Sequence, residues 1–145
     1  MKRVYLDNCC FNRPFDDQSH VKIRLETEAK LEVQARILLH KLELAWSYIL
    51  DFENMANPYN ERCETIQEWR KHAKIDIDES GTVLKKAHEL STLGLKNKDS
   101  LHVACAIEAK CDFFLTTDRK IINKSYLIQE ISVCTPIDLI EKDEE

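Results

Sequence analysis

The segment KDSLHVACAIEAKCDFFLTTD, from Lys98 to Asp118, decides the fold class of this chain. Asp99 opens a stretch of small and apolar residues that predicts a helix to Lys110. The apolar run FFLTT, from Phe113 to Thr117, then predicts a buried strand that ends at Asp118. A chain built from such alternating helices and strands favours an α/β domain with a mainly parallel sheet.

The rest of the chain repeats this alternation. Further strands are expected in four apolar runs, at 3–6, 42–50, 75–77 and 130–135. Helices are expected between them, at roughly 20–42, from a cap at Asp51 to before Pro58, at 61–74, and at 82–93 with Gly94 as the C-cap. The sequence therefore predicts five strands interleaved with helices.

The length of 145 residues is that of one domain, and we assign residues 1–140 to it. The acidic segment 141–145 is expected to be a frayed tail. The chain contains no long uncharged apolar run, which argues against a membrane protein, and its first residues lack the apolar core of a signal peptide. We therefore expect a cytoplasmic protein whose six cysteines are reduced thiols.

Several classes of chemistry are disfavoured by what the sequence lacks. With only two glycines, it has no glycine-rich phosphate-binding loop. Neither cysteines nor histidines have the spacing of a zinc site, and His102 is more typical of a packed helix residue than of a catalyst. Cys9 and Cys10 lack the arginine of a cysteine phosphatase. The net charge of −5 argues against nucleic-acid binding by bulk charge, but not against a metal site with a local basic rim.

Four carboxylates stand where predicted elements begin or end. Asp7 and Asp118 each follow a strand, Asp99 opens a helix, and Glu53 lies in a first helical turn just after a strand. Ligands of open parallel sheets bind at the carboxyl ends of the strands, and like charges gathered there repel one another unless a cation is present. Oxygen ligands without His or Cys suit Mg²⁺ or Mn²⁺.

Three segments resemble the PIN-domain family of metal-dependent ribonucleases: VYLDNCCFNRPF (4–15), FEN (52–54) and the Lys98–Asp118 stretch. The opening block is most similar to bacterial stand-alone PIN proteins. The resemblance implies a three-layer α/β/α sandwich with a mainly parallel five-stranded sheet, in which the first and fourth strands are neighbours. It also implies that Asp7, Glu53, Asp99 and Asp118 are the catalytic metal ligands, that Thr116 orients the site, and that Asn8 supports it. Asp51 remains an alternative to Glu53 as the second acid.

The resemblance implies a Mg²⁺- or Mn²⁺-dependent endoribonuclease. Many proteins of this kind are the toxins of toxin–antitoxin pairs, so the resemblance also implies a small antitoxin partner and a homodimer. Candidate RNA contacts are basic residues near the acids in sequence, namely Arg13, Lys96, Lys98, Arg119, Lys120 and Lys124. The alternatives are a PIN-like scaffold with weak or no catalysis that binds RNA or protein, and a flap-type DNA nuclease. The tryptophans and most phenylalanines are assigned to the core.

Overall fold

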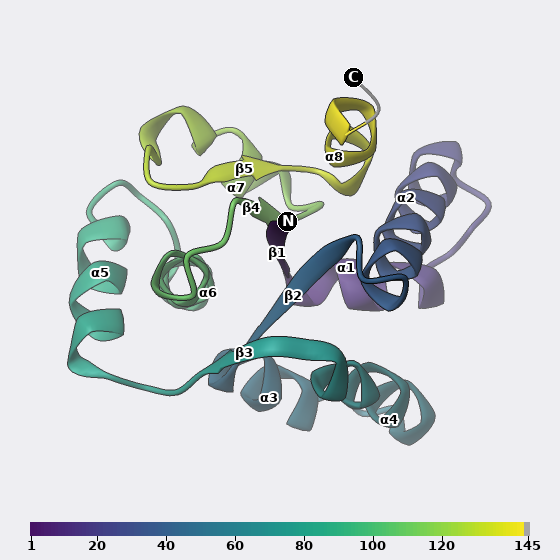
Figure 1. The fold of residues 1–145 in the computed structure, drawn as a ribbon, viewed down its shortest axis with the longest axis horizontal. Helices are drawn as coiled ribbons and strands as arrows, with labels where there is room; N and C mark the ends of the chain where they lie inside the picture. Colours follow the sequence, from purple (N-terminus) through teal and green to yellow (C-terminus); the bar gives the residue numbers. More distant parts are fainter. Residues whose placement is uncertain (144–145) are drawn as a thin grey trace.

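The computed structural model describes residues 1–143 and centres on one sheet of five parallel strands (Figure 1). The strand order is β3-β2-β1-β4-β5. The strands are β1 (Lys2–Leu6), β2 (Leu42–Ser47), β3 (Ala73–Ile77), β4 (Phe113–Leu115) and β5 (Ser132–Cys134). The expected pairing of the first and fourth strands is confirmed, with Leu6 opposite Leu115.

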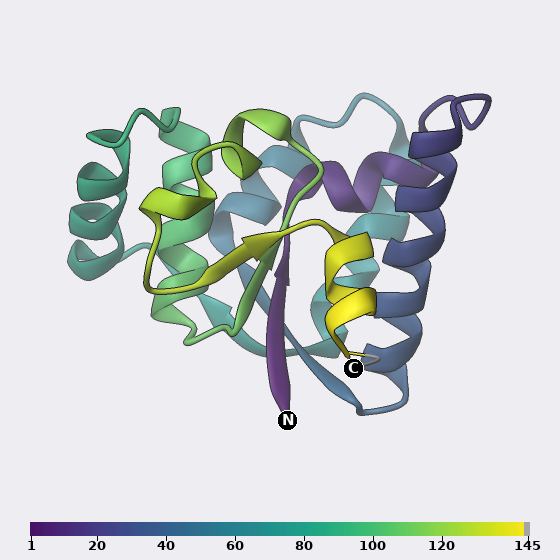
Figure 2. The ribbon, with the colours of Figure 1, turned by 90° about the horizontal axis from the view of Figure 1, so that it is seen from above.

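Helices cover both faces of the sheet, which confirms the predicted α/β/α sandwich (Figures 1 and 2). On one side lie α6 (Asn97–Glu108) and, packed outside it, α5 (Gly81–Ser91). On the other side lie α2 (Val21–Leu38) and α8 (Pro136–Asp143), which contact each other. None of the helices in this described part of the chain combines the length and the apolar character needed to cross a bilayer.

Four further helices lie around the carboxyl ends of the strands or join the other elements. They are α1 (Asn8–Asn12), α3 (Tyr48–Met55), α4 (Asn60–Gln67) and α7 (Arg119–Ile122), with 3₁₀ turns at Arg13–Phe15, Glu68–His72 and Ser125–Leu127. Helices α1 and α3 follow β1 and β2 directly, and α7 begins soon after β4. The residues that cap these helices therefore gather at one edge of the sheet.

The central strands are buried on both faces, as is usual for parallel sheets. Val4, Tyr5 and Leu6 of β1 are fully buried, and so are Trp46 and Phe114 on the neighbouring strands. Tyr5 stacks on Phe114, with ring centroids 5.4 Å apart. The core thus holds the end of β1 in a defined position, and with it the residues that follow.

Several predicted boundaries were wrong, each for a local reason. The helix expected to reach residue 42 ends at Leu38, because His40 takes a left-handed φ of 58° and residues 42–47 form β2. The helix expected at Asp51 begins three residues earlier, because the Ser47 side chain accepts a hydrogen bond from the Leu50 backbone N–H. The helix expected at 61–74 ends at Gln67 and continues as a 3₁₀ turn.

Two predictions near the chain's turns and end also need correction. Residues 141–143, expected in a frayed tail, belong to α8, while 144–145 lie outside the described residues. The C-cap of α5 is Thr92, and Gly94 lies two residues further on with a φ of +98°. A side chain at Gly94 would be strained in this conformation and would displace the Lys124 ammonium.

Gly94→Ala should therefore lower the free energy of unfolding by about 1 kcal/mol. Gly81 is a matched control, because it lies at the start of α5 and a Cβ there meets nothing within 4 Å. Gly81→Ala should leave stability unchanged or raise it by up to about 1 kcal/mol. Urea unfolding of the two variants measures both effects, and equal stabilities would show that the Gly94 turn imposes no strain.

Candidate active site

A cavity of about 470 Å³ opens at the carboxyl ends of β1, β2 and β4. All four carboxylates predicted from the sequence line it, namely Asp7, Glu53, Asp99 and Asp118. They come from four separate segments of the chain. The sheet topology brings them together, because β1 and β4 are adjacent at the point where the strand order changes direction.

Asp7 is the most buried of these acids, with 6% of its surface exposed. Its backbone N–H donates to the Leu115 carbonyl at 2.9 Å and so extends the pairing of β1 with β4 by one residue. Its Oδ1 accepts from the Asn8 backbone N–H at 2.8 Å, which caps α1. Its Oδ2 accepts from the Thr116 hydroxyl at 2.8 Å. The carboxylate is therefore held on both oxygens.

Thr116 connects the first and last acids. Its side chain is fully buried, and while its hydroxyl donates to Asp7, the same oxygen accepts from the Asp118 backbone N–H at 3.1 Å. Asp118 in turn caps α7, where its Oδ1 accepts from the Lys120 backbone N–H at 2.9 Å. The structure thus places Thr116 in contact with the carboxylate of Asp7 and with the backbone of Asp118.

Glu53 is held by two partners at the end of its side chain. Asn8 donates from Nδ2 to Glu53 Oε2 at 3.2 Å, and His102 Nε2 makes a short hydrogen bond to Oε1. Burial by itself raises the pKa of Glu53, but the hydrogen bond and charge of His102, with smaller effects of Lys98 and Asn8, outweigh it and lower the pKa. Glu53 is therefore ionised at neutral pH.

His102 belongs to the site, although the sequence favoured a packed structural role. It is 1% exposed, and its Nδ1 lies 2.6 Å from the Tyr5 hydroxyl, which is also 2.6 Å from Ser47 Oγ. Burial alone lowers the pKa of His102, but Glu53 and Asp7 outweigh it and raise the pKa. The sequence contained one indication of this position: His102 comes three residues after Asp99 and therefore lies on the same face of the helix.

Asp99 differs from the other acids because the structure gives its carboxylate no hydrogen bond within residues 1–143. Burial raises its pKa to about 6, and the negative charges of Asp7 and Asp118 add to the effect. The repulsion inferred from the sequence is therefore concentrated on Asp99. It is the carboxylate with the most to gain from a nearby cation.

Of Asp51 and Glu53, the two alternatives for the second acid, Glu53 lines the cavity and Asp51 does not. Asp51 Oδ1 accepts hydrogen bonds from Trp46 Nε1 at 2.8 Å and from Gln67 Nε2 at 2.7 Å, and the cavity lining does not include it. Arg70 lies 3.8 Å from its other oxygen. Asp51 holds α3 against β2 and α4, whereas Glu53 faces the cavity.

The predicted basic contacts divide into two groups. Lys96 and Lys98 line the cavity, and Lys120 and Lys124 line a smaller one beside it. Arg119 begins α7 directly after Asp118. Arg13 differs from these residues, because its guanidinium contacts Asp16, Glu26 and Thr117 within the fold. We therefore remove Arg13 from the candidate RNA contacts.

Two further side chains at this edge were not predicted. Phe52 is 60% exposed, and the Lys98 ammonium lies 5.7 Å from its ring centroid. The thiol of Cys9 lines the cavity and lies 3.4 Å from Asp7 Oδ2. Phe52 thus adds an exposed aromatic ring next to the acids, and Cys9 adds a thiol, whose sulfur is a soft metal ligand.

The donor chemistry of the cavity fits a hard divalent cation. Four carboxylates share it, and burial together with the negative charges of its neighbours raises the pKa of Asp99. Within residues 1–143, however, no three His, Cys, Asp or Glu side chains already have the mutual geometry of a metal site. The hydrogen bonds of Asp7 and Glu53 explain this, because their oxygens are directed at Thr116, Asn8 and His102. Binding a cation would require these side chains to adjust.

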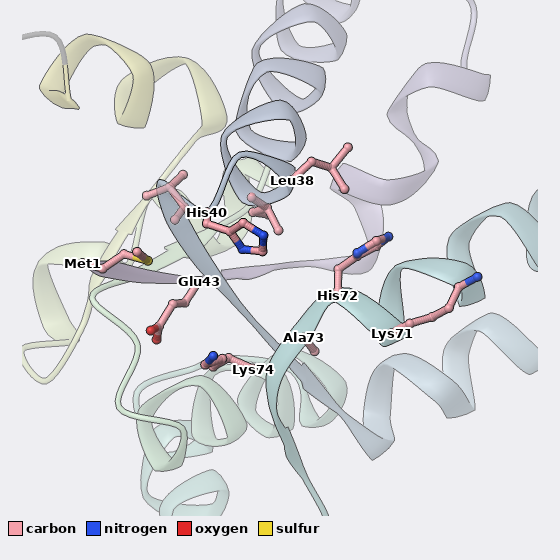
Figure 3. A pocket seen from close by; sticks show the side chains of 10 residues that line it. Met1, Leu38, His40, Glu43, Lys71, His72, Ala73 and Lys74 are labelled. Carbon is pink, nitrogen blue, oxygen red and sulfur yellow. The ribbon is translucent and has the colours of Figure 1, made fainter.

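A second cavity, of about 510 Å³, lies at the opposite end of the strands (Figure 3). Met1, Glu43 and Lys74 reach it from the amino ends of β1, β2 and β3, and His40 and His72 also line it. Glu43 is 3.0 Å from Arg3 in an ion pair. This cavity is larger, but it lies far from the carboxyl ends where the acids gather, so we do not take it as the active site.

Comparison with solved structures identifies the fold. The chain is similar to a chain in the crystal structure of VapBC2 from Rickettsia felis bound to a DNA fragment from their promoter, with a TM-score of 0.59 and 15% identity. The match covers 90% of this chain and 96% of the other. Neither the family models nor the curated proteins gave a match. Together with the strand order, this likeness shows that the chain has a PIN-like fold.

The raised pKa of Asp99 predicts a cost to stability in the metal-free protein. The folded state releases the Asp99 proton near pH 6 and the unfolded chain near pH 4, so the cost is full above pH 6 and absent below pH 4. Asp99→Asn should therefore melt at a higher temperature than wild type at pH 7.5 in EDTA, by about 2–5 °C. The gain should fade as the pH approaches 4.

Asp17→Asn serves as the control, because the hydrogen bond from the Ser19 backbone N–H lowers the pKa of Asp17. It should bring no gain in melting temperature at pH 7.5. If Asp99→Asn also melts no higher than wild type, burial and the neighbouring carboxylates do not destabilise the ionised Asp99 as the geometry indicates.

Proposed function

We propose that this chain is a Mg²⁺- or Mn²⁺-dependent endoribonuclease that hydrolyses RNA phosphodiester bonds and is the toxin of a cytoplasmic toxin–antitoxin pair. The observation that carries the proposal is the convergence of Asp7, Glu53, Asp99 and Asp118 in one cavity of a PIN-like fold. Four like charges held together destabilise a folded state. A protein that only binds RNA or protein gains nothing from them that would offset this cost.

The metal ligands would be Asp7, Glu53, Asp99 and Asp118. When bound, a divalent cation supplies positive charge at the scissile phosphate and lowers the pKa of water. Thr116 holds Asp7 and the backbone of Asp118 in place, and Asn8 and His102 hold Glu53. The protein's contribution is to fix the carboxylates at the edge of a rigid sheet.

RNA would approach over the basic side of the cavity. Lys96 and Lys98 line the cavity itself, so they stand where phosphates next to the scissile one would lie. Lys120 lies beside Lys96 in the adjoining cavity. These lysines offset the acids locally, in a chain whose net charge of −5 opposes nucleic-acid binding elsewhere on its surface.

The proposal of a partner rests on the structural likeness. The similar chain comes from a structure of VapBC2. From that likeness and from the PIN resemblance of the sequence, we propose that this chain binds a small antitoxin and forms a homodimer. The cytoplasmic location agrees with the reduced state of the cysteines, all of which are free.

The central prediction is metal-dependent cleavage. Wild type should cut single-stranded or hairpin RNA with Mn²⁺ and not with EDTA, and it should leave single-stranded DNA intact. Asp7→Asn and Glu53→Gln should each lower the cleavage rate by about 100-fold or more, because each removes a metal ligand. Labelled substrates resolved on denaturing gels measure the rates.

Asp51→Asn provides the matched control, since Asp51 lies two residues from Glu53 but outside the cavity. It should cut at a rate close to that of wild type. Loss of cleavage in Asp51→Asn but not in Glu53→Gln would reverse the assignment of the second acid, and cleavage of DNA alone would favour the DNA-nuclease alternative.

Metal binding can be tested without catalysis. Mn²⁺ at ten times its dissociation constant should stabilise wild type by about 1.4 kcal/mol and raise its melting temperature by about 2–5 °C. The shift should be smaller for Asp7→Asn. A melting temperature unaffected by Mn²⁺, together with no cleavage, would mean that the acids do not bind metal and that the chain is a PIN-like scaffold.

A further inference from the structure

A separate cavity of about 250 Å³ is lined by residues of α1, α2 and α4 and of the 3₁₀ turns Arg13–Phe15 and Glu68–His72. Its walls are apolar and largely aromatic, formed by Phe11, Phe15, Leu31, Ile66 and Trp69. Phe11 and Ile66 are buried, while Phe15 and Leu31 are 40% and 49% exposed and form the open rim. The proposed nuclease site uses none of these residues.

Lys30 lines this cavity from α2. Only 6% of the residue is exposed, yet the structure gives its ammonium no hydrogen bond and no ion pair anywhere in residues 1–143. Its nearest aromatic neighbour is Phe11, whose ring centroid is 5.7 Å from Nζ. Burial lowers the pKa of Lys30 to about 8, so most of the side chain is still charged at neutral pH.

Gln34 lies one helical turn after Lys30 and lines the same cavity. It is 4% exposed, and its Nε2 is buried without a hydrogen-bond partner in the described part of the chain. Both groups are donors without a partner in the described residues: Gln34 Nε2 is fully buried, whereas Lys30 Nζ keeps a small solvent-accessible surface. A buried donor without an acceptor destabilises the folded state, and a largely buried charge without a partner does so more strongly.

Two donors, one of them cationic, at an apolar cavity define the chemistry of a complementary ligand. A carboxylate would pair with the ammonium and accept from the amide, and an apolar group of side-chain size would fill the space between the rings. The volume is below that of most sites for drug-sized ligands, which favours a small group.

We propose that this cavity binds a carboxylate attached to an apolar group of side-chain size, with Lys30 and Gln34 holding the carboxylate. The group belongs either to a free small acid or to an acidic residue beside an apolar one in a peptide. The chemistry recognised is the same in both cases.

The test compares acids with their neutral amides. The free acids are 3-phenylpropionate, 4-methylpentanoate and hexanoate, and the peptides are an array of blocked pentapeptides with Asp or Glu between two apolar residues, matched by Asn and Gln. Binding of each free acid is measured by titration calorimetry and by the fluorescence of Trp69, which lines the cavity. A dissociation constant on the order of 1 mM is expected for the best free acid.

The carboxylate should bind at least about tenfold more tightly than its amide, and this preference should disappear in Lys30→Met. Lys22→Met is the control, because Lys22 is exposed on the same helix. Binding of the free acids assigns a small ligand, and binding of the acidic peptides alone assigns a polypeptide. The proposal is overturned if no acid binds, if amides bind equally well, or if Lys30→Met retains the preference.

A stability measurement separates a binding role of Lys30 from a structural one. Removing an unpaired buried charge should raise the melting temperature of Lys30→Met by about 2–5 °C without ligand. A lower melting temperature would show that the ammonium stabilises the fold and would overturn the proposal. Gln34→Met supplies a second variant, in which acid binding should weaken while the protein remains folded.

Discussion

The parallel pairing of β1 with β4 is the contact on which the rest of the site depends. It sets Leu6 opposite Leu115, and the Asp7 N–H then bonds to the Leu115 carbonyl. Residues 7 and 116 consequently lie at the same level of the sheet edge, where the Thr116 hydroxyl reaches the Asp7 carboxylate. A shift of register by one residue would turn these side chains to opposite faces of the sheet, and the buried strand interiors oppose such a shift.

The second constraint is electrostatic. Carboxylates placed this close repel one another, and the fold stabilises three of the four with local donors: a backbone N–H and a hydroxyl for Asp7, a backbone N–H for Asp118, and a histidine with an asparagine for Glu53. Asp99 receives no such donor, and its pKa rises to about 6. The site is therefore stabilised around three acids and remains unfavourable at the fourth, which is where a cation would be most effective.

The sequence predicted the features that depend on hydrophobic pattern and strand order. Apolar runs such as residues 3–6 and 113–117 located strands, and polar residues at their ends located the acids. It did not predict features that depend on which side chain meets which neighbour. Ser47 rather than Asp51 caps α3, and Arg13 is bound within the fold. His102 pairs with Glu53, a residue 49 positions away in the chain, and no local pattern reports such a contact.

The distribution of the four acids along the chain has a consequence for synthesis. Asp7 leaves the ribosome more than 100 residues before the strand that pairs with β1 and orients Asp7 through Thr116, because that strand spans residues 113–115. Until that strand emerges, β1 has only β2 beside it, and three of the four carboxylates belong to a nascent chain without a completed sheet. The centre is thus assembled only after residue 118 has been synthesised, and a polypeptide released before that residue carries no assembled cavity.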